Sequence, residues 1–220
     1  VQTCALPILA CLNLATALLL SALARDGMKL ARAKTDFQKA KAKVNEAERT
    51  LGGYWGYRCR VVIESAKDDF KYGPKLADAI RKAVMFRDSR RMTEAATEYG
   101  VAAKIAKQTR KPDIAVELLF EQASLHLRQD HFSKAAESYR QITSDQPAHT
   151  RAADAHLLWA YCLGRMYDAD RTKVRRLAYM NALEDHRKQF HTSATPWEAA
   201  WMLATPQERR LQTNHALKPP

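Results

Sequence analysis

The side chains of this sequence that could transfer protons or bind a metal are scattered along the chain. Its histidines include two pairs that lie five residues apart, His126 with His131 and His186 with His191. Neighbours on one face of a helix lie three or four residues apart, so neither pair shares a face. We therefore expect these histidines to have surface or packing roles, with no metal bound.

Carboxylates next to one another could act as a general acid and base. Glu184 and Asp185 precede His186, but adjacent side chains on a helix point apart. We expect the pairs Asp68-Asp69 and Asp168/Asp170 to be loop and capping residues.

The cysteines predict neither a zinc site nor a disulfide framework. Cys11, Cys59 and Cys162 lie far apart and form no C-x-x-C pair. We expect them to be buried free thiols in helices. The sequence also contains no glycine-rich phosphate loop, no G-x-S-x-G, no H-E-x-x-H and no calcium-binding loop. It therefore predicts no enzymatic activity, no cofactor and no small-molecule substrate.

Composition excludes several classes of protein and favours helices. The 220 residues include only 7 Gly and 8 Pro, too few turn formers for a β-barrel. Alanine, leucine, lysine, arginine and glutamate, which are good helix formers, dominate instead. The 36 basic and 24 acidic residues give a net charge of +12, which favours an acidic partner such as nucleic acid, an anionic membrane or an acidic protein surface.

Two kinds of basic segment are candidates for binding an anionic partner. Residues 53–60 (GYWGYRCR) combine aromatic rings with arginines, which could stack on bases and contact phosphates. We favour the alternative, a helix start whose rings pack on the next hairpin. The other segments, 80–111 and 171–176, hold many more cations than anions. A solvated helix face explains each of these basic segments singly, but together they indicate an anionic partner.

The first residues call for separate treatment. The octet 1–8 (VQTCALPI) resembles the translation of a sequencing-library adapter, and we exclude it from the fold. Residues 9–24 form the longest apolar run, with two interpretations. A signal or membrane anchor would make the protein exported, whereas a buried helix would favour the cytosol.

Spacings of three and four between apolar residues predict helices along the chain. We expect them at residues 28–50, 54–67, 74–87, 91–109, 113–129, 132–145, 151–167 and 172–190. The short run 61–63 (VVI) could instead be a strand. Two capping boxes, beginning at Thr195 and Thr205, predict further helices. Trp197 and Trp201 share a face of the first of these, and we expect them to pack on the preceding hairpin.

An internal repeat follows from two similar segments. Residues 91–99 and 131–139 share a Ser or Thr, a pair of alanines and a final tyrosine, Tyr99 or Tyr139. The offset of 40 residues continues to Tyr179, without the alanines. Short connections between the predicted helices indicate that neighbours pack antiparallel, as stacked hairpins.

This pattern resembles the tetratricopeptide repeat family, whose second helix carries an alanine and, four residues later, an aromatic residue. The best unit spans 116–147 and matches at Leu119, Ala123, Phe132, Ala135, Tyr139 and Pro147. It departs from the family at Gln122, where leucine is usual, and at Asp130, where glycine is usual. Other units are expected at about 14–50, 76–109 and 151–190, within a repeat domain at 9–204 followed by a short helix and tail at 205–220. The offset of 40 exceeds the family's usual period of about 34, so helices must be longer or loops inserted.

The resemblance implies an all-α, right-handed solenoid that acts as a protein-interaction scaffold. Its partner, a peptide or helix, would lie in a concave groove lined by first helices. In the best unit the resemblance assigns to this groove Glu117, Phe120, Ser124, Leu127 and Arg128. Neighbouring Arg81 and Arg87 would favour an acidic ligand. The alternative is a helical-repeat protein that binds nucleic acid through its basic face.

Overall fold

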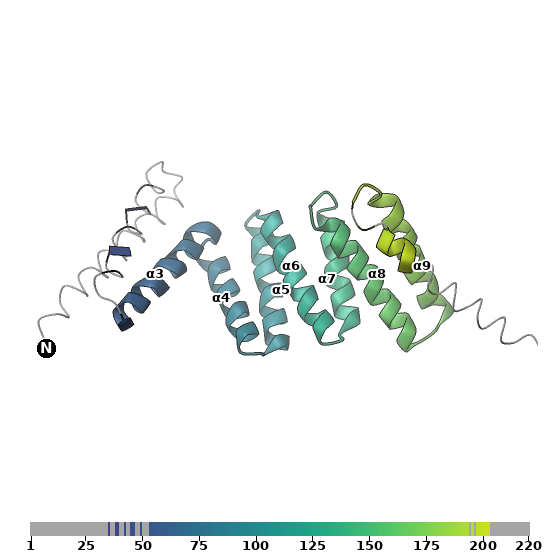
Figure 1. The fold of residues 1–220 in the computed structure, drawn as a ribbon, viewed down its shortest axis with the longest axis horizontal. Coiled ribbons are helices and arrows are strands. Elements are labelled where there is room, and N and C mark those ends of the chain that lie inside the picture. Colours follow the sequence, from purple (N-terminus) through teal and green to yellow (C-terminus); the bar gives the residue numbers. More distant parts are fainter. Residues whose placement is uncertain are drawn as a thin grey trace, which may run out of the picture. The chain divides into compact units, whose positions relative to one another are not determined.

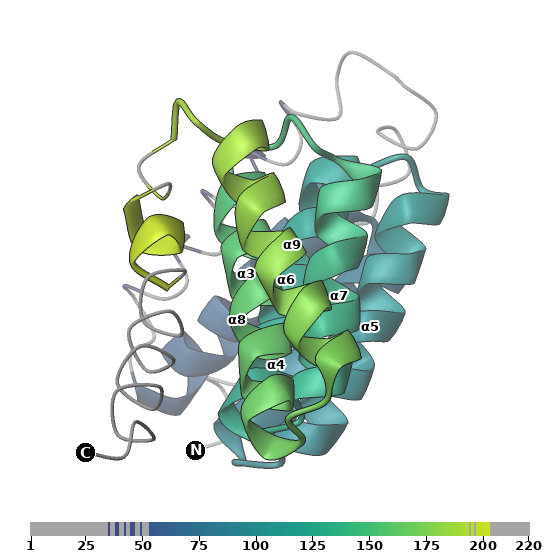
Figure 2. The same ribbon diagram turned by 90° about the vertical axis from the view of Figure 1, so that its right-hand side faces the viewer.

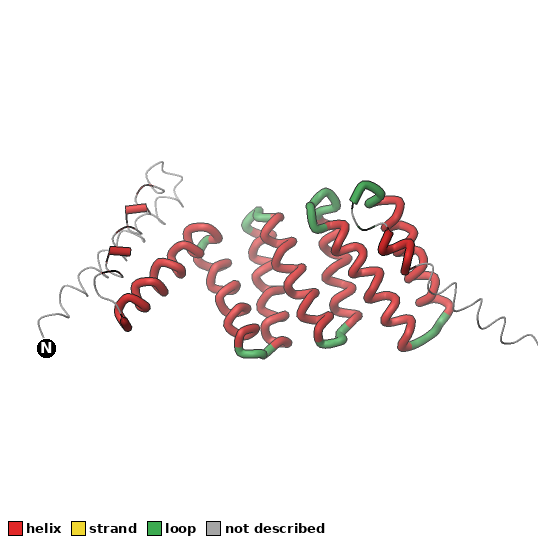
Figure 3. Tube along the Cα trace, viewed as in Figure 1, coloured by secondary structure: helices red, strands yellow, loops and turns green. Residues whose placement is uncertain are grey.

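The structure is a computed structural model that describes residues 53–193, 195 and 197–202, together with isolated positions between 35 and 49. The described part of the chain is helical and contains no strand (Figure 1; Figure 3). The predicted all-α class is therefore confirmed. The predictions for residues 1–8, residues 9–24, the Thr205 capping box and the tail lie outside the described residues, as does most of the unit at 14–50.

The helices follow the predicted order, and most of their ends lie within two residues of prediction. They are α3 (Gly53–Tyr72), α4 (Pro74–Asp88), α5 (Met92–Gln108), α6 (Pro112–Arg128), α7 (Phe132–Asp145), α8 (Ala152–Ala169), α9 (Lys173–Gln189) and a short helix at 197–202.

Helix α3 continues five residues beyond the predicted end. Residues 61–63 are therefore helical, and the expectation that Asp68 and Asp69 lie in a loop is wrong. Asp168 also lies within a helix, whereas Asp170 is the C-cap residue of α8 and pairs with Arg175 at 3.5 Å.

The chain divides into two compact units, residues 1–78 and 79–220, with the division inside α4. In the first unit α3 ends at Gly73, whose φ of +82° is a conformation that glycine adopts without steric cost. Its N–H donates to the carbonyl of Asp69 at 2.8 Å, and Pro74 then begins α4 with a φ suited to a first helical position.

In the second unit each helix from α5 to α9 packs against the next one along the chain. The connections are short, so successive helices alternate in direction (Figure 1). Seen along the row, α5 and α7 lie to one side of α6 and α8 (Figure 2). The turns after α4, α6 and α8 lie at one end of the helices, and those after α5 and α7 at the other.

Three of these turns share one geometry. Arg90, Arg110 and Asp130 have φ values of +59°, +57° and +56°. Each is followed by a residue whose N–H returns to a carbonyl five residues earlier, as in Lys111 N–H to Ala106 O at 2.9 Å. This is the Schellman ending of a helix. The same residue then begins the next helix, because the carbonyl of Lys111 accepts the N–H of Ala115 at 3.1 Å.

The shared turn gives the helices a period of 20 residues. Positions 95, 115, 135 and 155 are all alanine and all buried. Positions 99, 119 and 139 hold the larger buried side chains Tyr99, Leu119 and Tyr139. The alanines allow neighbouring helices to approach, and the larger residues fill the space between them. The 40-residue repeat of the sequence thus corresponds to two helices with their turns. Helices α5 and α6 have 17 residues each.

Two glycines lie where neighbouring helices approach each other closely. A methyl group at Gly100 would lie 2.6 Å from the side-chain nitrogen of Gln122, so the glycine makes room for this glutamine. At Gly164 a methyl group would lie 3.0 Å from the ring of Tyr179, which is how α9 packs closely on α8.

The turn geometry predicts that Arg90→Gly stabilises the protein. A non-glycine residue in the left-handed region costs roughly 1–2 kcal/mol, and the greater freedom of glycine in the unfolded chain returns about half of that. We expect a gain of about 0.5–1 kcal/mol in the free energy of unfolding, measured by urea denaturation. Lys104→Gly is the control, because Lys104 is an exposed residue inside α5, and it should lose about 1 kcal/mol. Destabilisation by both substitutions would contradict the assigned geometry.

Candidate functional site

The predicted groove residue Phe120 lies half-buried on α6, between two neighbouring elements. Its ring meets that of Tyr139 edge-on, with centroids 5.3 Å apart. The guanidinium of Arg151, at the start of α8, lies 4.3 Å from the centroid of the Phe120 ring. Edge-to-face and cation–π contacts of this kind each contribute about 0.5–1 kcal/mol and fix the orientation of the ring.

Glu117, one turn before Phe120, holds Arg151 in place. Its carboxylate pairs with the Arg151 guanidinium at 2.8 Å, and both side chains are partly exposed. A pair this exposed contributes little to stability. Its effect is to position the Arg151 guanidinium over the ring of Phe120. Glu117, Arg151 and Phe120 therefore form one connected group of side chains.

Ser124 completes this part of the α6 face. Its hydroxyl lies 3.3 Å from that of Tyr139. Burial raises the pKa of Tyr139, and the Ser124 bond opposes this rise. Because its hydroxyl lies within hydrogen-bond distance of the buried Tyr139, Ser124 helps to hold the ring that orients Phe120.

The remaining predicted groove residues lie further away along the helices. Leu127 is half-buried and Arg128 exposed, both in the last turn of α6. On α4, Arg87 donates to the Tyr99 hydroxyl at 3.2 Å and pairs with Asp88 at 3.2 Å. Arg81 is half-buried on the same helix. The structure thus brings Glu117, Phe120 and Ser124 together.

Sequence reasoning missed two members of this site. Arg151 is one, because a residue at the start of the next hairpin carries no signal that it reaches α6. The other is Glu121, whose charge raises the pKa of Tyr139 and Tyr99 after the larger effect of burial. Burial lowers the pKa of Arg87, but Tyr99, Asp88 and Glu121 outweigh this and raise it. Glu121 is therefore close enough to Arg87, Tyr99 and Tyr139 to influence their titration.

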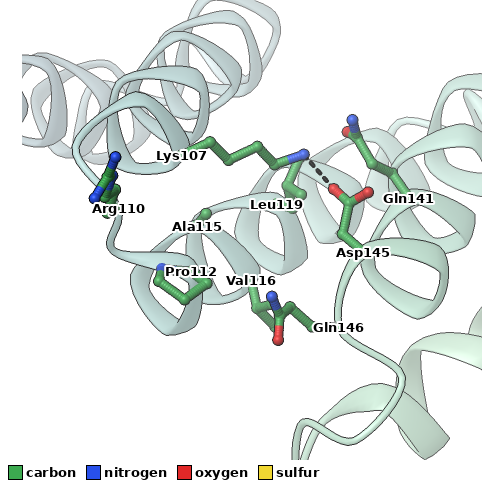
Figure 4. Close-up of a pocket in the computed structure, with 9 residues that line it drawn as sticks. All are labelled: Lys107, Arg110, Pro112, Ala115, Val116, Leu119, Gln141, Asp145 and Gln146. Carbon is green, nitrogen blue, oxygen red and sulfur yellow. Dashed lines mark hydrogen bonds and ion pairs between the residues drawn. The ribbon is translucent and has the colours of Figure 1, made fainter.

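A cleft of about 660 Å³ opens where the end of α5, the start of α6 and the end of α7 meet (Figure 4). Its floor is apolar, made by the buried side chains of Ala115, Val116 and Leu119. Its rim is polar and consists of Lys107, Arg110, Gln141, Asp145 and Gln146, with Pro112 between floor and rim. Such a volume lies within the range of small-ligand sites.

An ion pair crosses this cleft. The ammonium of Lys107 on α5 contacts the carboxylate of Asp145 at the end of α7, as the dashed line in Figure 4 shows. The two residues are 38 apart in the sequence, so the pair joins two helices that both flank α6. No spacing signal in the sequence predicts this contact.

A second feature that the sequence did not reveal is a cluster of buried aromatic rings between α8, α9 and the segment after α9. His156 and His186 are 5% and 0% exposed, and their ring centroids lie 5.3 Å apart. Phe190 packs against both rings, at 5.4 and 5.2 Å, and Trp159 meets His156 edge-on at 5.0 Å. His186 therefore pairs with a histidine from the preceding helix, whereas His191 is exposed.

His186 also holds the chain that leads to the short helix. Its Nε2 lies 2.9 Å from the hydroxyl of Thr195, which lies 2.8 Å from that of Ser193. The predicted capping role of the Thr195 hydroxyl is thus replaced, in the bonds recorded for it, by contacts to these two side chains. The Thr195 carbonyl still accepts the N–H of Ala199 at 3.3 Å and begins the helix.

Burial keeps both imidazoles neutral. It lowers the pKa of His186 to about 4, with a smaller contribution from His156. Burial also lowers the pKa of His156, although the charge of Asp185 opposes the shift. The Nδ1 atom of each ring is buried and has no recorded hydrogen-bond partner, so a proton there would have no acceptor in the described structure.

We predict that the second unit loses stability in mild acid. Unfolded histidines take up protons below a pKa of about 6.5, whereas the folded His186 stays neutral until about pH 4. The free energy of unfolding should therefore be largest above pH 6.5 and fall by roughly 2–3 kcal/mol between pH 6.5 and 4. Urea denaturation across this range measures the effect.

The variant His156→Leu/His186→Leu should reduce this loss, since it removes two of the three histidines whose pKa is lowered by burial and leaves His126 in place. His191→Leu is the matched control, because that histidine is exposed, and it should leave the profile unchanged. A wild-type profile that stays flat from pH 7 to 4 would contradict the assignment.

Other predictions concerning the described residues have mixed outcomes. Cys162 is a buried free thiol, as expected, and burial raises its pKa to about 12. Although His126 and His131 do not share a helix face, the turn between α6 and α7 brings their rings to 6.1 Å. Burial is the main reason that the pKa of His126 is lowered.

Two predictions that aromatic side chains pack on a neighbouring hairpin are wrong. Trp197 and Trp201 are 67% and 68% exposed, and Ala199 and Met202 pack on the preceding helices in their place. The segment 53–60 does begin a helix, α3, but Tyr54 and Tyr57 are exposed and do not fill a hairpin. In both cases the helix was predicted correctly and its buried face was not.

Comparison with models of protein families finds no match, and comparisons with curated proteins and with solved structures find none either. Within the described residues no three side chains of His, Cys, Asp or Glu are placed to hold a metal ion. No helix in the described part of the chain is both long and apolar enough to cross a membrane.

Proposed function

We propose that this protein is a non-enzymatic interaction scaffold that binds a peptide or helix of a partner on the α6 face. The observation that carries the proposal is the setting of Phe120. Its half-buried ring is oriented by Tyr139 and by the Glu117–Arg151 pair. An aromatic side chain that is rigid and still partly accessible is typical of the residues that dominate binding at protein interfaces.

A tetratricopeptide-like right-handed solenoid is our interpretation of the architecture. It is supported by the packing of each helix on the next and by the 20-residue spacing of the buried alanines. The glycine-preferring position of the family pattern, held here by Asp130, has a φ of +56°, as that pattern implies. In such a solenoid α4, α6 and α8 are first helices and line the groove.

Charges around Phe120 would select the ligand. Arg151 is committed to Glu117, and Arg87 to Asp88 and Tyr99, so both cations are partly neutralised. Arg128 is exposed at the C-terminal end of α6. A ligand with an apolar anchor near Phe120 and Leu127 and an acidic group toward Arg128 fits this arrangement best.

We predict that Phe120→Ala and Leu127→Ala weaken binding of a selected ligand. Peptides selected on the wild-type protein by phage display provide the ligands, and isothermal titration measures their affinity. Loss of an aromatic anchor should reduce affinity tenfold or more. Val101→Ala, an exposed apolar truncation on α5, is the control. Unchanged affinities in both groove variants, with unchanged thermal stability, would refute the proposal.

Nucleic-acid binding is the second candidate, favoured by a specific arrangement of cations. The turns after α4 and α8 lie at the same end of the helices (Figure 1) and carry the exposed residues Arg90, Arg91, Arg171 and Lys173. Phosphate binding by such residues weakens steeply and linearly with the logarithm of the salt concentration.

Retention of a 20-nucleotide RNA between 50 and 300 mM salt separates the two candidates. The variant that replaces Arg81, Lys82, Arg87, Arg90 and Arg91 by alanine should then lose retention. If retention is unchanged, the nucleic-acid candidate is excluded, whereas peptide binding should depend far less on salt.

A further inference from the structure

We propose that the cleft between α5, α6 and α7 is a second binding site, for a short acidic peptide that carries aliphatic side chains. The proposal does not depend on the function of the α6 face around Phe120. It rests on three features of the cleft: its apolar floor, an arginine on its rim that lacks a partner, and an ion pair that spans it.

The floor fits aliphatic side chains. Ala115, Val116 and Leu119 line it, none of them polar or aromatic, and Pro112 adds a further apolar surface. The volume of about 660 Å³ exceeds the needs of one leucine side chain and leaves room for the backbone of a short segment. The amides of Gln141 and Gln146 on the rim can both donate and accept hydrogen bonds, which suits a peptide backbone.

The rim selects a negative charge. Lys107 and Asp145 neutralise each other, which leaves Arg110 as the remaining charge of the lining. Arg110 is exposed, and no ion pair or hydrogen bond of its side chain occurs within the described residues. Its backbone φ of +57° is one that favours glycine, yet arginine occupies the position. The start of α6 lies next to it and adds the partial positive charge of a helix N-terminus.

The Lys107–Asp145 ion pair spans the cleft above its apolar floor. It joins α5 to α7 across the cleft when no ligand is present, and both of its side chains are partly exposed. A preformed site avoids part of the entropic cost of binding. An acidic group of the ligand is attracted by Arg110, whereas a basic ligand meets Arg110 as a like charge.

The cleft is separate from the α6 face described above. At 100° per residue, the floor residues Ala115, Val116 and Leu119 centre on one direction around α6. Phe120, Ser124 and Glu117 lie roughly 90°, 130° and 150° around the helix from that direction. The two sites can therefore be changed one at a time.

Fluorescence anisotropy with the full chain tests the proposal. The probes are three fluorescein-labelled pentapeptides, EELLE, QQLLQ and KKLLK. We expect EELLE to bind, QQLLQ to bind several-fold more weakly because it lacks the charge that Arg110 attracts, and KKLLK not to bind. Arg110→Ala should weaken EELLE about three- to fivefold, as loss of an exposed ionic contact does. Gln141→Trp, which places a large ring at the mouth of the cleft, should abolish binding.

Two matched variants show where the peptide binds. Phe120→Ala changes the α6 face, and Arg128→Ala removes an exposed cation at the opposite end of α6 from Arg110. Both should bind EELLE as the wild type does, and amide shifts in nitrogen-15 spectra should change at Val116 and Leu119. The proposal is overturned if EELLE does not bind, if KKLLK binds equally well, or if Phe120→Ala abolishes binding while Arg110→Ala does not. The last of these outcomes would place EELLE on the α6 face instead, whereas the first two say nothing about that face.

Discussion

The second unit depends on one backbone constraint, the overlap of a helix end with the next helix start. At Arg91, Lys111 and His131 the N–H closes the preceding helix and the carbonyl opens the following one. Because a single residue ends one helix and begins the next, no additional linker residues separate the two helices. Each helix must therefore fold back directly on its neighbour. From α4 to α7 the 20-residue register, the burial of alanine at the same point of successive helices and the alternation of direction follow from this overlap, whereas the loop 146–150 leads into α8.

The two proposed binding sites are positioned by the same packing of helices. Phe120 faces the start of α8 because the register sets α8 beside α6, where Arg151 can reach the ring. The cleft exists because α5 and α7 flank α6 at the level where α7 ends, three residues shorter than α5. Both sites are thus products of helix length and order, with few side chains specialised for them.

Helix positions could be predicted from the sequence because apolar spacing, proline and short turns act locally. The repeat of 40 was also visible, since alanine pairs and tyrosines mark buried positions. The sequence could not show which residues from different helices meet. Arg151 over Phe120, Lys107 with Asp145 and His156 with His186 all join residues 30 or more apart, where no local rule applies. Trp197 and Trp201 show the same limit, because spacing revealed a shared face but not that the small Ala199 was the buried one.

The connection between α7 and α8 is the exception to the overlapping turns. There α7 ends at Asp145, and five residues pass before Arg151 begins α8. Adding one residue to any of the three tight turns would rotate the following helix by about 100° and turn its alanines away from the core. None of residues 146–150 both ends one helix with its N–H and begins the next with its carbonyl. Among the connections from α4 to α8, this loop is therefore where natural variants of the chain can change in length without rebuilding the stack, and where a second protein could be inserted.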